Sequence, residues 1–193
     1  GAARPFVHRP TINHQTFLLD SQQSLLQSGL IPPSLEKDYQ AMMQQLCDKV
    51  GPLYKPEKIR RVHGDCHIGN LLWHDDRPLL LDFDDSRNGP AVQDLWLLLN
   101  GDRVEQTYQL SLLLEEYEQY CDFDHKELRL IEPLRAMRIL SYMAWIAKRW
   151  SDPAFPKNFP WFSTDQYWQQ QLRALDEQLK FCDQSPLSLM PQW

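Results

Sequence analysis

The sequence predicts a mainly α-helical fold that carries a small β-hairpin. In several long segments apolar residues recur at steps of three and four, which is the spacing of one face of an α-helix. Short apolar runs separated by a polar turn occur between residues 59 and 81, and this pattern is typical of a hairpin. The 193 residues suffice for one domain with its own core, and the apolar content of 42% is in the globular range.

The first third of the chain is expected to be extended and then helical. Residues 1–13 carry two prolines and no periodicity, so they are predicted to form an extended lead-in. A short helix is expected at residues 15–27. A stronger amphipathic helix follows from Leu35 to Val50, and Gly51 with Pro52 is predicted to end it.

The remaining elements are predicted from apolar runs and their boundaries. Pro133 is expected to bend its helix or to reset the start of that helix. Residues 151–162, rich in proline and aromatic residues, are expected to pack on the body, and residues 185–193 form a tail. We predict a single domain over residues 1–193. The expected elements are a strand at 59–62, a hairpin with strands at 71–73 and 79–81, a polar loop at 86–90, and helices at 91–100, 102–120, 124–150 and 163–181.

Composition narrows the possible partners and location. The net charge is −6 and no Lys/Arg cluster stands out, so a nucleic-acid partner is not expected. No segment approaches the ~20 apolar residues of a membrane span, so no membrane partner is expected. The four cysteines lie far apart without a C-x-x-C motif, which favours reduced thiols in the cytoplasm over a disulfide framework or a zinc site.

The stretch from residue 63 to residue 94 carries the candidate chemistry. Asp65 and Asn70 have the D-x4-N spacing of a kinase catalytic loop, and Asp82 ends the apolar run that follows. These groups match the needs of phosphoryl transfer from a magnesium nucleotide. Asp65 is the candidate catalytic base that orients the attacking hydroxyl. Asn70 and Asp82 are the candidate Mg²⁺ ligands, and an Asp at the end of an apolar strand would need such a cation beside it.

Other interpretations of the same residues stay open. Asp65 and Asn70 could each serve only as turn residues. His63, Asp65 and His67 alternate along the chain, so an extended backbone would place them on one face as in a zinc hydrolase. Against zinc, Gly64 makes an extended loop unnecessary, and no third histidine motif accompanies the pair.

The motifs resemble a known superfamily. HGDCHIGN, followed by LLLDFDD and QDLW, is similar to the aminoglycoside phosphotransferase and choline kinase superfamily, whose fold is protein-kinase-like. Within it, DFDDSRNGPAVQDLWLLLNGD, EPLRAMRI and RWSDPAFPKNFPW resemble bacterial stress-response serine/threonine protein kinases. The resemblance extends from His8 nearly to the C-terminus. One departure is large, because the chain has no G-x-G-x-x-G and no V-A-I-K-like strand, and its seven glycines are scattered singly.

The resemblance therefore implies the large C-terminal lobe of a protein-kinase-like fold, with the N-terminal ATP-clamping lobe absent from this chain. It implies that His63 anchors the catalytic loop and that Asp94 is buried and hydrogen-bonds that loop. His67 replaces a lysine and is expected near the γ-phosphate, with a packing role as the alternative.

The expected cofactors are ATP and Mg²⁺, and the expected acceptors are Ser/Thr hydroxyls of proteins. The expected partners are ATP, a protein substrate and the missing lobe. One alternative is a small-molecule kinase for an aminoglycoside, choline or homoserine. The other is an inactive fragment or interaction module. By itself, the chain is expected to fold without catalysing.

Overall fold

The computed structural model describes residues 4–190, which divide into two compact units. The first unit combines the lead-in up to Ile12, the segment Lys55–Ile131 and the tail from Ser185. The second unit combines Asn13–Tyr54 with Glu132–Gln184. Both units are therefore discontinuous in sequence. The expectation of a single domain over residues 1–193 stays a prediction, and residues 1–3 and 191–193 lie outside the described part.

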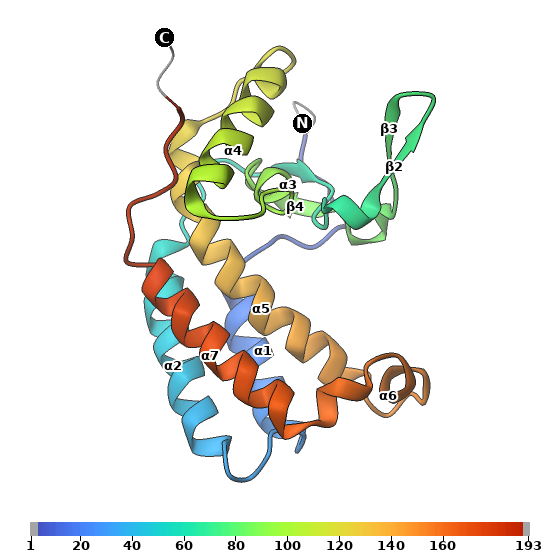
Figure 1. The fold of residues 1–193 in the computed structure, drawn as a ribbon, viewed down its shortest axis with the longest axis vertical. Helices are drawn as coiled ribbons and strands as arrows, with labels where there is room; N and C mark the ends of the chain where they lie inside the picture. Colours follow the sequence, from blue (N-terminus) through green and yellow to red (C-terminus); the bar gives the residue numbers. More distant parts are fainter. Residues whose placement is uncertain (1–3, 191–193) are drawn as a thin grey trace. The chain divides into compact units, whose positions relative to one another are not determined.

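The second unit is a bundle of helices. In Figure 1, α1, α2, α7 and the main part of α5 run alongside one another. The bundle packs around Tyr39, Leu46 and Trp168, all fully buried, and the Tyr39 hydroxyl donates to the Trp168 carbonyl at 2.5 Å. Its elements are η1 (Gln15–Leu19), α1 (Asp20–Gln27), α2 (Glu36–Leu53), α5 (Ile131–Lys148), α6 (Ala154–Asn158), η5 (Pro160–Ser163) and α7 (Asp165–Phe181).

The predicted boundaries of α2 and α7 are wrong by a few residues, and the helix predicted at 124–150 begins as α5 only at Ile131, close to Pro133 where a new start was expected. Helix α2 continues past Gly51 and Pro52 to Leu53. Pro52 lies in the last turn, and the Tyr54 N–H still closes that turn on the Val50 carbonyl at 2.9 Å. Helix α7 begins at Asp165 instead of residue 163, because the Thr164 hydroxyl accepts from the Tyr167 N–H and caps the helix there.

The segment of residues 151–162 packs against the bundle, as predicted. Phe155 and Phe159 lie against Trp145 of α5, with ring centroids 5.1 and 6.0 Å from it. Phe162 is fully buried, and its ring lies 5.0 Å from that of Trp168. Contacts of this kind between aromatic rings add about 0.5–1.5 kcal/mol each beyond the burial of their area.

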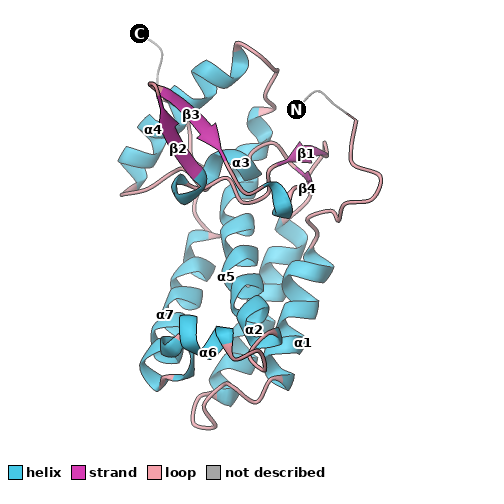
Figure 2. Ribbon diagram, turned by 90° about the vertical axis from the view of Figure 1, so that its right-hand side faces the viewer, coloured by secondary structure: helices cyan, strands magenta, loops and turns pink. Residues whose placement is uncertain are grey.

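The first unit holds the strands, drawn in magenta in Figure 2. The strands form two antiparallel pairs, β1 with β4 and β2 with β3. The predicted hairpin is confirmed and turns at Asp75 and Asp76, which both have positive φ (47° and 57°), as a two-residue type I′ turn requires. The unit contains β1 (Arg60–Val62), η2 (Ile68–Asn70), β2 (Leu71–His74), β3 (Arg77–Leu80), η3 (Phe83–Asp85), β4 (Arg87–Gly89), α3 (Gln93–Trp96), α4 (Arg103–Glu118) and η4 (His125–Leu130).

Two predictions between residues 86 and 100 are wrong. The expected polar loop contains β4, which pairs Gly89 with Arg60. Helix α3 ends at Trp96 instead of near Asn100, and the chain continues in tight turns, such as the one closed from the Leu99 N–H to the Trp96 carbonyl. An unbroken apolar run carries no helical period, so its length alone did not mark the end of the helix.

Asn88 in β4 holds the lead-in. Its side-chain oxygen accepts from the Phe6 N–H at 2.7 Å, and its amide nitrogen donates to the carbonyls of Phe6 and Arg9. Its backbone N–H donates to the Pro10 carbonyl, and its backbone carbonyl accepts from the Ile12 N–H, both at 2.8 Å. Five hydrogen bonds to one residue thus attach the lead-in to the strand that precedes α3.

None of the helices within residues 4–190 combines the length and the apolar character that a membrane span needs. The predicted fold class is confirmed: the chain is mainly helical, with a small amount of antiparallel strand.

Candidate active site

The predicted site residues all lie in the first unit, on the loop after β1, at the end of the hairpin and in α3. His63 connects the loop after β1 to the end of the hairpin. Its Nε2 donates to the Leu81 carbonyl at 2.7 Å, and its Nδ1 accepts from the Asp65 N–H at 3.3 Å. The neutral imidazole with its proton on Nε2 satisfies both bonds at once. Because Leu81 directly precedes Asp82, this buried ring links the positions of Asp65 and Asp82.

Asp94 holds the start of the same loop. Its carboxylate accepts from the backbone N–H groups of His63 at 2.7 Å and of Gly64 at 2.9 Å. Burial raises the pKa of the Asp94 carboxyl, while these two hydrogen bonds and the nearby His63 act in the opposite direction. The loop therefore depends on a half-buried carboxylate at the beginning of a short helix.

Asp65 lies partly open to solvent, with 21% of its side chain exposed. Its Oδ2 is 3.5 Å from Nε2 of His67. The Nδ1 of His67 accepts from the Gly69 N–H at 2.9 Å, so in a neutral ring the proton is on Nε2, facing the carboxylate. The structure thus places His67 beside Asp65 and at the N-terminus of η2.

Asn70 connects the loop to the hairpin. Its side-chain nitrogen donates to the Asp65 carbonyl at 2.9 Å, and its own carbonyl accepts from the Leu81 N–H at 2.9 Å. Because a carbonyl can only accept, the amide nitrogen must face it. The Oδ1 atom is the end of the amide that remains for a cation.

Asp82 adopts a left-handed backbone, with φ 60° and ψ 67°, and its side chain is exposed. The sequence argument that it ends an apolar strand is wrong, because β3 stops at Leu80 and Asp82 lies beyond it. Left-handed residues other than glycine are uncommon, and strained backbone of this kind occurs often at functional sites. Asp75 and Asp76, the other two described examples, are accounted for by the hairpin turn.

The donor atoms suit magnesium better than zinc. Within residues 4–190, no three His, Cys, Asp or Glu side chains gather closely enough to hold a metal ion, so the zinc alternative has no geometric support. Asn70 and Asp82 offer one amide oxygen and one carboxylate. Magnesium prefers oxygen ligands and is commonly held by one or two protein groups, with phosphates and water completing its shell.

Two buried polar residues that hydrogen-bond the loop or the start of α3 were not predicted as site residues. The Gln93 side chain donates to the Gly64 carbonyl at 2.9 Å. Glu127 accepts from the Val92 N–H at 3.0 Å, and burial raises the pKa of its carboxyl. The available signal for Gln93 was a neutral polar residue inside an otherwise apolar segment.

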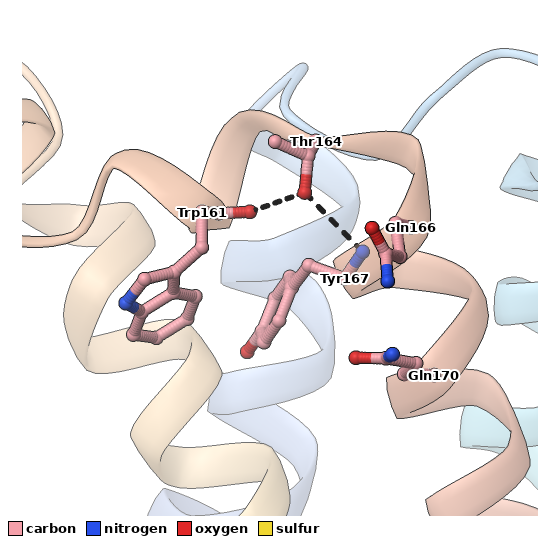
Figure 3. Close-up of a pocket in the computed structure, with 5 residues that line it drawn as sticks. All are labelled: Trp161, Thr164, Gln166, Tyr167 and Gln170. Atoms are coloured by element: carbon pink, nitrogen blue, oxygen red, sulfur yellow. Dashed lines mark hydrogen bonds between the residues drawn. The ribbon is translucent and has the colours of Figure 1, made fainter.

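A pocket of about 410 Å³ opens on the second unit, between η5 and the first turns of α7 (Figure 3). The rings of Trp161 and Tyr167 lie 4.7 Å apart, and the Thr164 hydroxyl donates to the Trp161 carbonyl. Gln166 and Gln170 complete the lining. The pocket contains no carboxylate and none of the predicted site residues, so we do not assign phosphoryl transfer to it.

Comparison with known proteins decides the family. The model of a family described as "Phosphotransferase enzyme family" matches residues 1–131, which include the whole loop and hairpin. The chain belongs to the phosphotransferase enzyme family. Membership agrees with the resemblance predicted from the HGD and DFD motifs.

Curated proteins that are similar to this chain in sequence carry kinase names. Stress response kinase A of Escherichia coli (strain K12) is 45% identical over 194 residues, which cover 100% of this chain and 59% of the relative. A Salmonella typhimurium protein named "Serine/threonine protein kinase RdoA" is 46% identical, with the same coverage. The chain thus spans about three-fifths of the length of these relatives.

A solved structure supports the fold of this chain. The crystal structure of a choline/ethanolamine kinase family protein from Mesorhizobium loti aligns with a TM-score of 0.53 at 16% identity. The alignment covers 96% of this chain and 57% of that protein. The likeness concerns the fold, and it agrees with the predicted large lobe of a kinase-like fold.

Proposed function

We propose that this chain is the catalytic lobe of an ATP-dependent kinase that phosphorylates Ser/Thr hydroxyls of proteins. The observation that carries the proposal is the hydrogen-bonded frame of His63 and Asn70, which links Asp65 to the residue before Asp82. Kinase chemistry needs a base and metal ligands held at fixed positions relative to each other. The relative named a serine/threonine protein kinase supports the acceptor class.

In this proposal Asp65 is the base. Its partly exposed carboxylate accepts a hydrogen bond from the acceptor hydroxyl, directs that oxygen at the γ-phosphorus and takes the proton late in the transfer. The Nε2 atom of His67 lies 3.5 Å from the same Asp65 carboxylate. His67 therefore has the position to stabilise the Asp65 anion, and from there to approach a phosphate oxygen.

Asn70 and Asp82 would hold Mg²⁺ in the proposed complex. Magnesium held there would neutralise the negative charge that develops on the phosphates during the transfer. The exposed Asp82 side chain leaves room for a nucleotide on its open side. The left-handed backbone of Asp82 keeps its carboxylate at the turn into η3, next to the anchored Leu81.

The nucleotide clamp requires more than this chain contains. No G-x-G-x-x-G loop and no V-A-I-K-like strand occur in the 193 residues. We propose that a further N-terminal lobe supplies them, and we expect the chain by itself not to turn over ATP. The four unpaired cysteines support a cytoplasmic location. A role in bacterial stress response follows the names of the relatives.

The test is a phosphoryl-transfer assay on the full-length protein with Mg-ATP. Generic protein acceptors are compared with an aminoglycoside, choline and homoserine, and the Asp65→Asn variant serves as the control. Transfer to Ser/Thr of proteins that disappears in Asp65→Asn supports the proposal. Transfer to a small alcohol alone would show that the acceptor is a small molecule and not a protein, while phosphoryl transfer would remain the reaction. Transfer that persists in Asp65→Asn would show that Asp65 is not the base.

A further inference from the structure

Gln93, the first residue of α3, uses both ends of its side-chain amide inside the protein. Only 6% of the residue is exposed. Its Nε2 donates to the Gly64 carbonyl at 2.9 Å, and its Oε1 accepts from the indole N–H of Trp96 at 3.2 Å. Buried amides that make both kinds of bond are held in one orientation.

Trp96 determines which end of the amide faces the loop. An indole N–H can only donate, so it takes the amide oxygen and leaves the amide nitrogen for Gly64. If the Gln93 amide flipped, two acceptors would meet at Gly64 and two donors at Trp96. Because Gln93 and Trp96 are three residues apart in α3, they lie on the same side of the helix, and their contact turns the amide nitrogen of Gln93 towards the Gly64 carbonyl.

The peptide unit that receives this bond leads directly into Asp65. Its carbonyl, from Gly64, accepts from Gln93, and its N–H, from Asp65, donates to Nδ1 of His63. The preceding N–H, from Gly64, is held by Asp94. Gln93 and Asp94 are neighbours in α3, so one short helix holds Gly64 by its carbonyl and by its N–H.

Gly64 needs this restraint because of its backbone. Its φ is +86°, and an added Cβ would lie 2.5 Å from the Asp85 carbonyl oxygen, so the position requires glycine. Glycine has more backbone freedom than any other residue, and its peptide units turn easily unless other groups hold them. Rotation of the 64–65 peptide would move the Asp65 carboxylate away from its aligned position.

We propose that Gln93 is a positioning residue for the phosphoryl transfer: it orients the Asp65 carboxylate through the Gly64 carbonyl. The inference rests on the proposed function, because it concerns the residue assigned there as the base. A misplacement of about 1 Å in a reacting group can lower a rate on the order of 100-fold. Loss of the Gln93 donor is therefore expected to lower kcat strongly and to leave the KM for ATP nearly unchanged.

The main comparison uses two matched substitutions in the full-length protein, Gln93→Met and Gln178→Met. Gln178 is also buried, with 6% exposed, and its side chain donates to a backbone carbonyl, that of Glu132, at 3.1 Å. It belongs to the other compact unit. Both variants are expected to lose stability, and kcat is measured below both melting temperatures. We expect a fall of about 100-fold in kcat for Gln93→Met and none for Gln178→Met.

A third variant, Gln93→Glu, adds a pH readout that a purely structural role would not produce. The ionised carboxylate can accept from Trp96 but cannot donate to Gly64. As the pH falls, the carboxyl becomes protonated and can donate again. The ratio of kcat in Gln93→Glu to kcat in wild type at the same pH should therefore rise towards acid pH. A ratio that stays flat, or that falls, would overturn the positioning role.

A nuclear magnetic resonance readout separates this inference from the proposed function. The backbone amide signal of Asp65 should shift in Gln93→Met and stay in place in Gln178→Met, whatever the activity. If wild type transfers no phosphate, the proposed function fails. If the Asp65 signal also stays unshifted in Gln93→Met, the influence of Gln93 on the 64–65 peptide is wrong as well. If wild type is active and Gln93→Met keeps the wild-type kcat, or loses no more than Gln178→Met, the proposed function stands and the positioning role is wrong.

Discussion

Replacing Asp94 by alanine should destabilise the protein by a large part of its folding free energy. The carboxylate accepts from the N–H groups of His63 and Gly64, both on buried residues. Alanine removes both acceptors and leaves two buried donors without them. At ~1–3 kcal/mol for each stranded donor, the expected loss is ~2–6 kcal/mol. Domains of ordinary stability have only about 5–15 kcal/mol in total.

Asp102→Ala provides a matched control. Asp102 also accepts from two backbone N–H groups, those of Val104 at 2.8 Å and Glu105 at 2.9 Å, but it caps α4 in an exposed position. Water can replace the lost acceptor there, so the expected loss is ~1 kcal/mol. Urea unfolding of the two variants, followed by circular dichroism and tryptophan fluorescence, measures the difference. Equal losses would refute the conclusion that Asp94 satisfies N–H donors on buried residues.

The pH dependence gives a second check on Asp94. Burial raises the pKa of its carboxyl above the ordinary 3.8, so the folded state binds this proton more tightly than the unfolded state. The contribution of this group to stability therefore falls as the pH rises from 3.8 through the raised pKa. Asp94→Asn lacks the titration, so the advantage of wild type over Asp94→Asn should narrow across that range. An advantage that widens with pH would show that the hydrogen bonds to the ionised form dominate.

Three further predictions follow from the site. Asp65→Asn should lower kcat in the full-length protein by at least ~100-fold with ATP affinity nearly unchanged, measured by steady-state kinetics and calorimetry. Asp82→Ala should weaken ATP binding mainly at limiting magnesium, so magnesium-independent affinity in titrations would remove Asp82 from the metal site. Burial, with help from Asp94 and Asp65, raises the pKa of the Cys66 thiol to about 11. Alkylation of Cys66 at pH 8 should therefore be slow in the folded protein, faster as the pH approaches that value and fast after unfolding, as peptide mapping can show.

The elements that could be predicted from the sequence are those with local causes. Tyr39, Leu46 and Val50 of the apolar stripe predicted for α2 are buried as their spacing indicates, whereas Leu35 and Met42 of the same stripe are only half-buried. The two-residue turn at Asp75 and Asp76 follows from the polar interruption between apolar runs. Strand β4 could not be predicted, because its partner β1 lies far away in the chain.

The candidate site was predictable in its residues and less so in its environment. The D-x4-N spacing singles out Asp65 and Asn70, which the structure joins by a direct hydrogen bond. The exposure of Asp82 was missed, because it depends on where β3 ends. The role of Gln93 was missed as well, because it depends on a tertiary contact with Gly64 that no local pattern records.

The five hydrogen bonds of Asn88 have a consequence for the order in which the chain is made. Phe6 leaves the ribosome 82 residues before the Asn88 side chain that holds it, and the whole Asn13–Tyr54 segment of the other unit emerges in between. The packing partners of that segment are synthesised later still, because the Tyr39 hydroxyl donates to the carbonyl of Trp168, 129 residues further along the chain. Synthesis must therefore begin both units before it can complete either. An excised 55–131 fragment would keep the catalytic loop and leave Asn88 without its partners, so shortened versions for expression should retain residues 4–12.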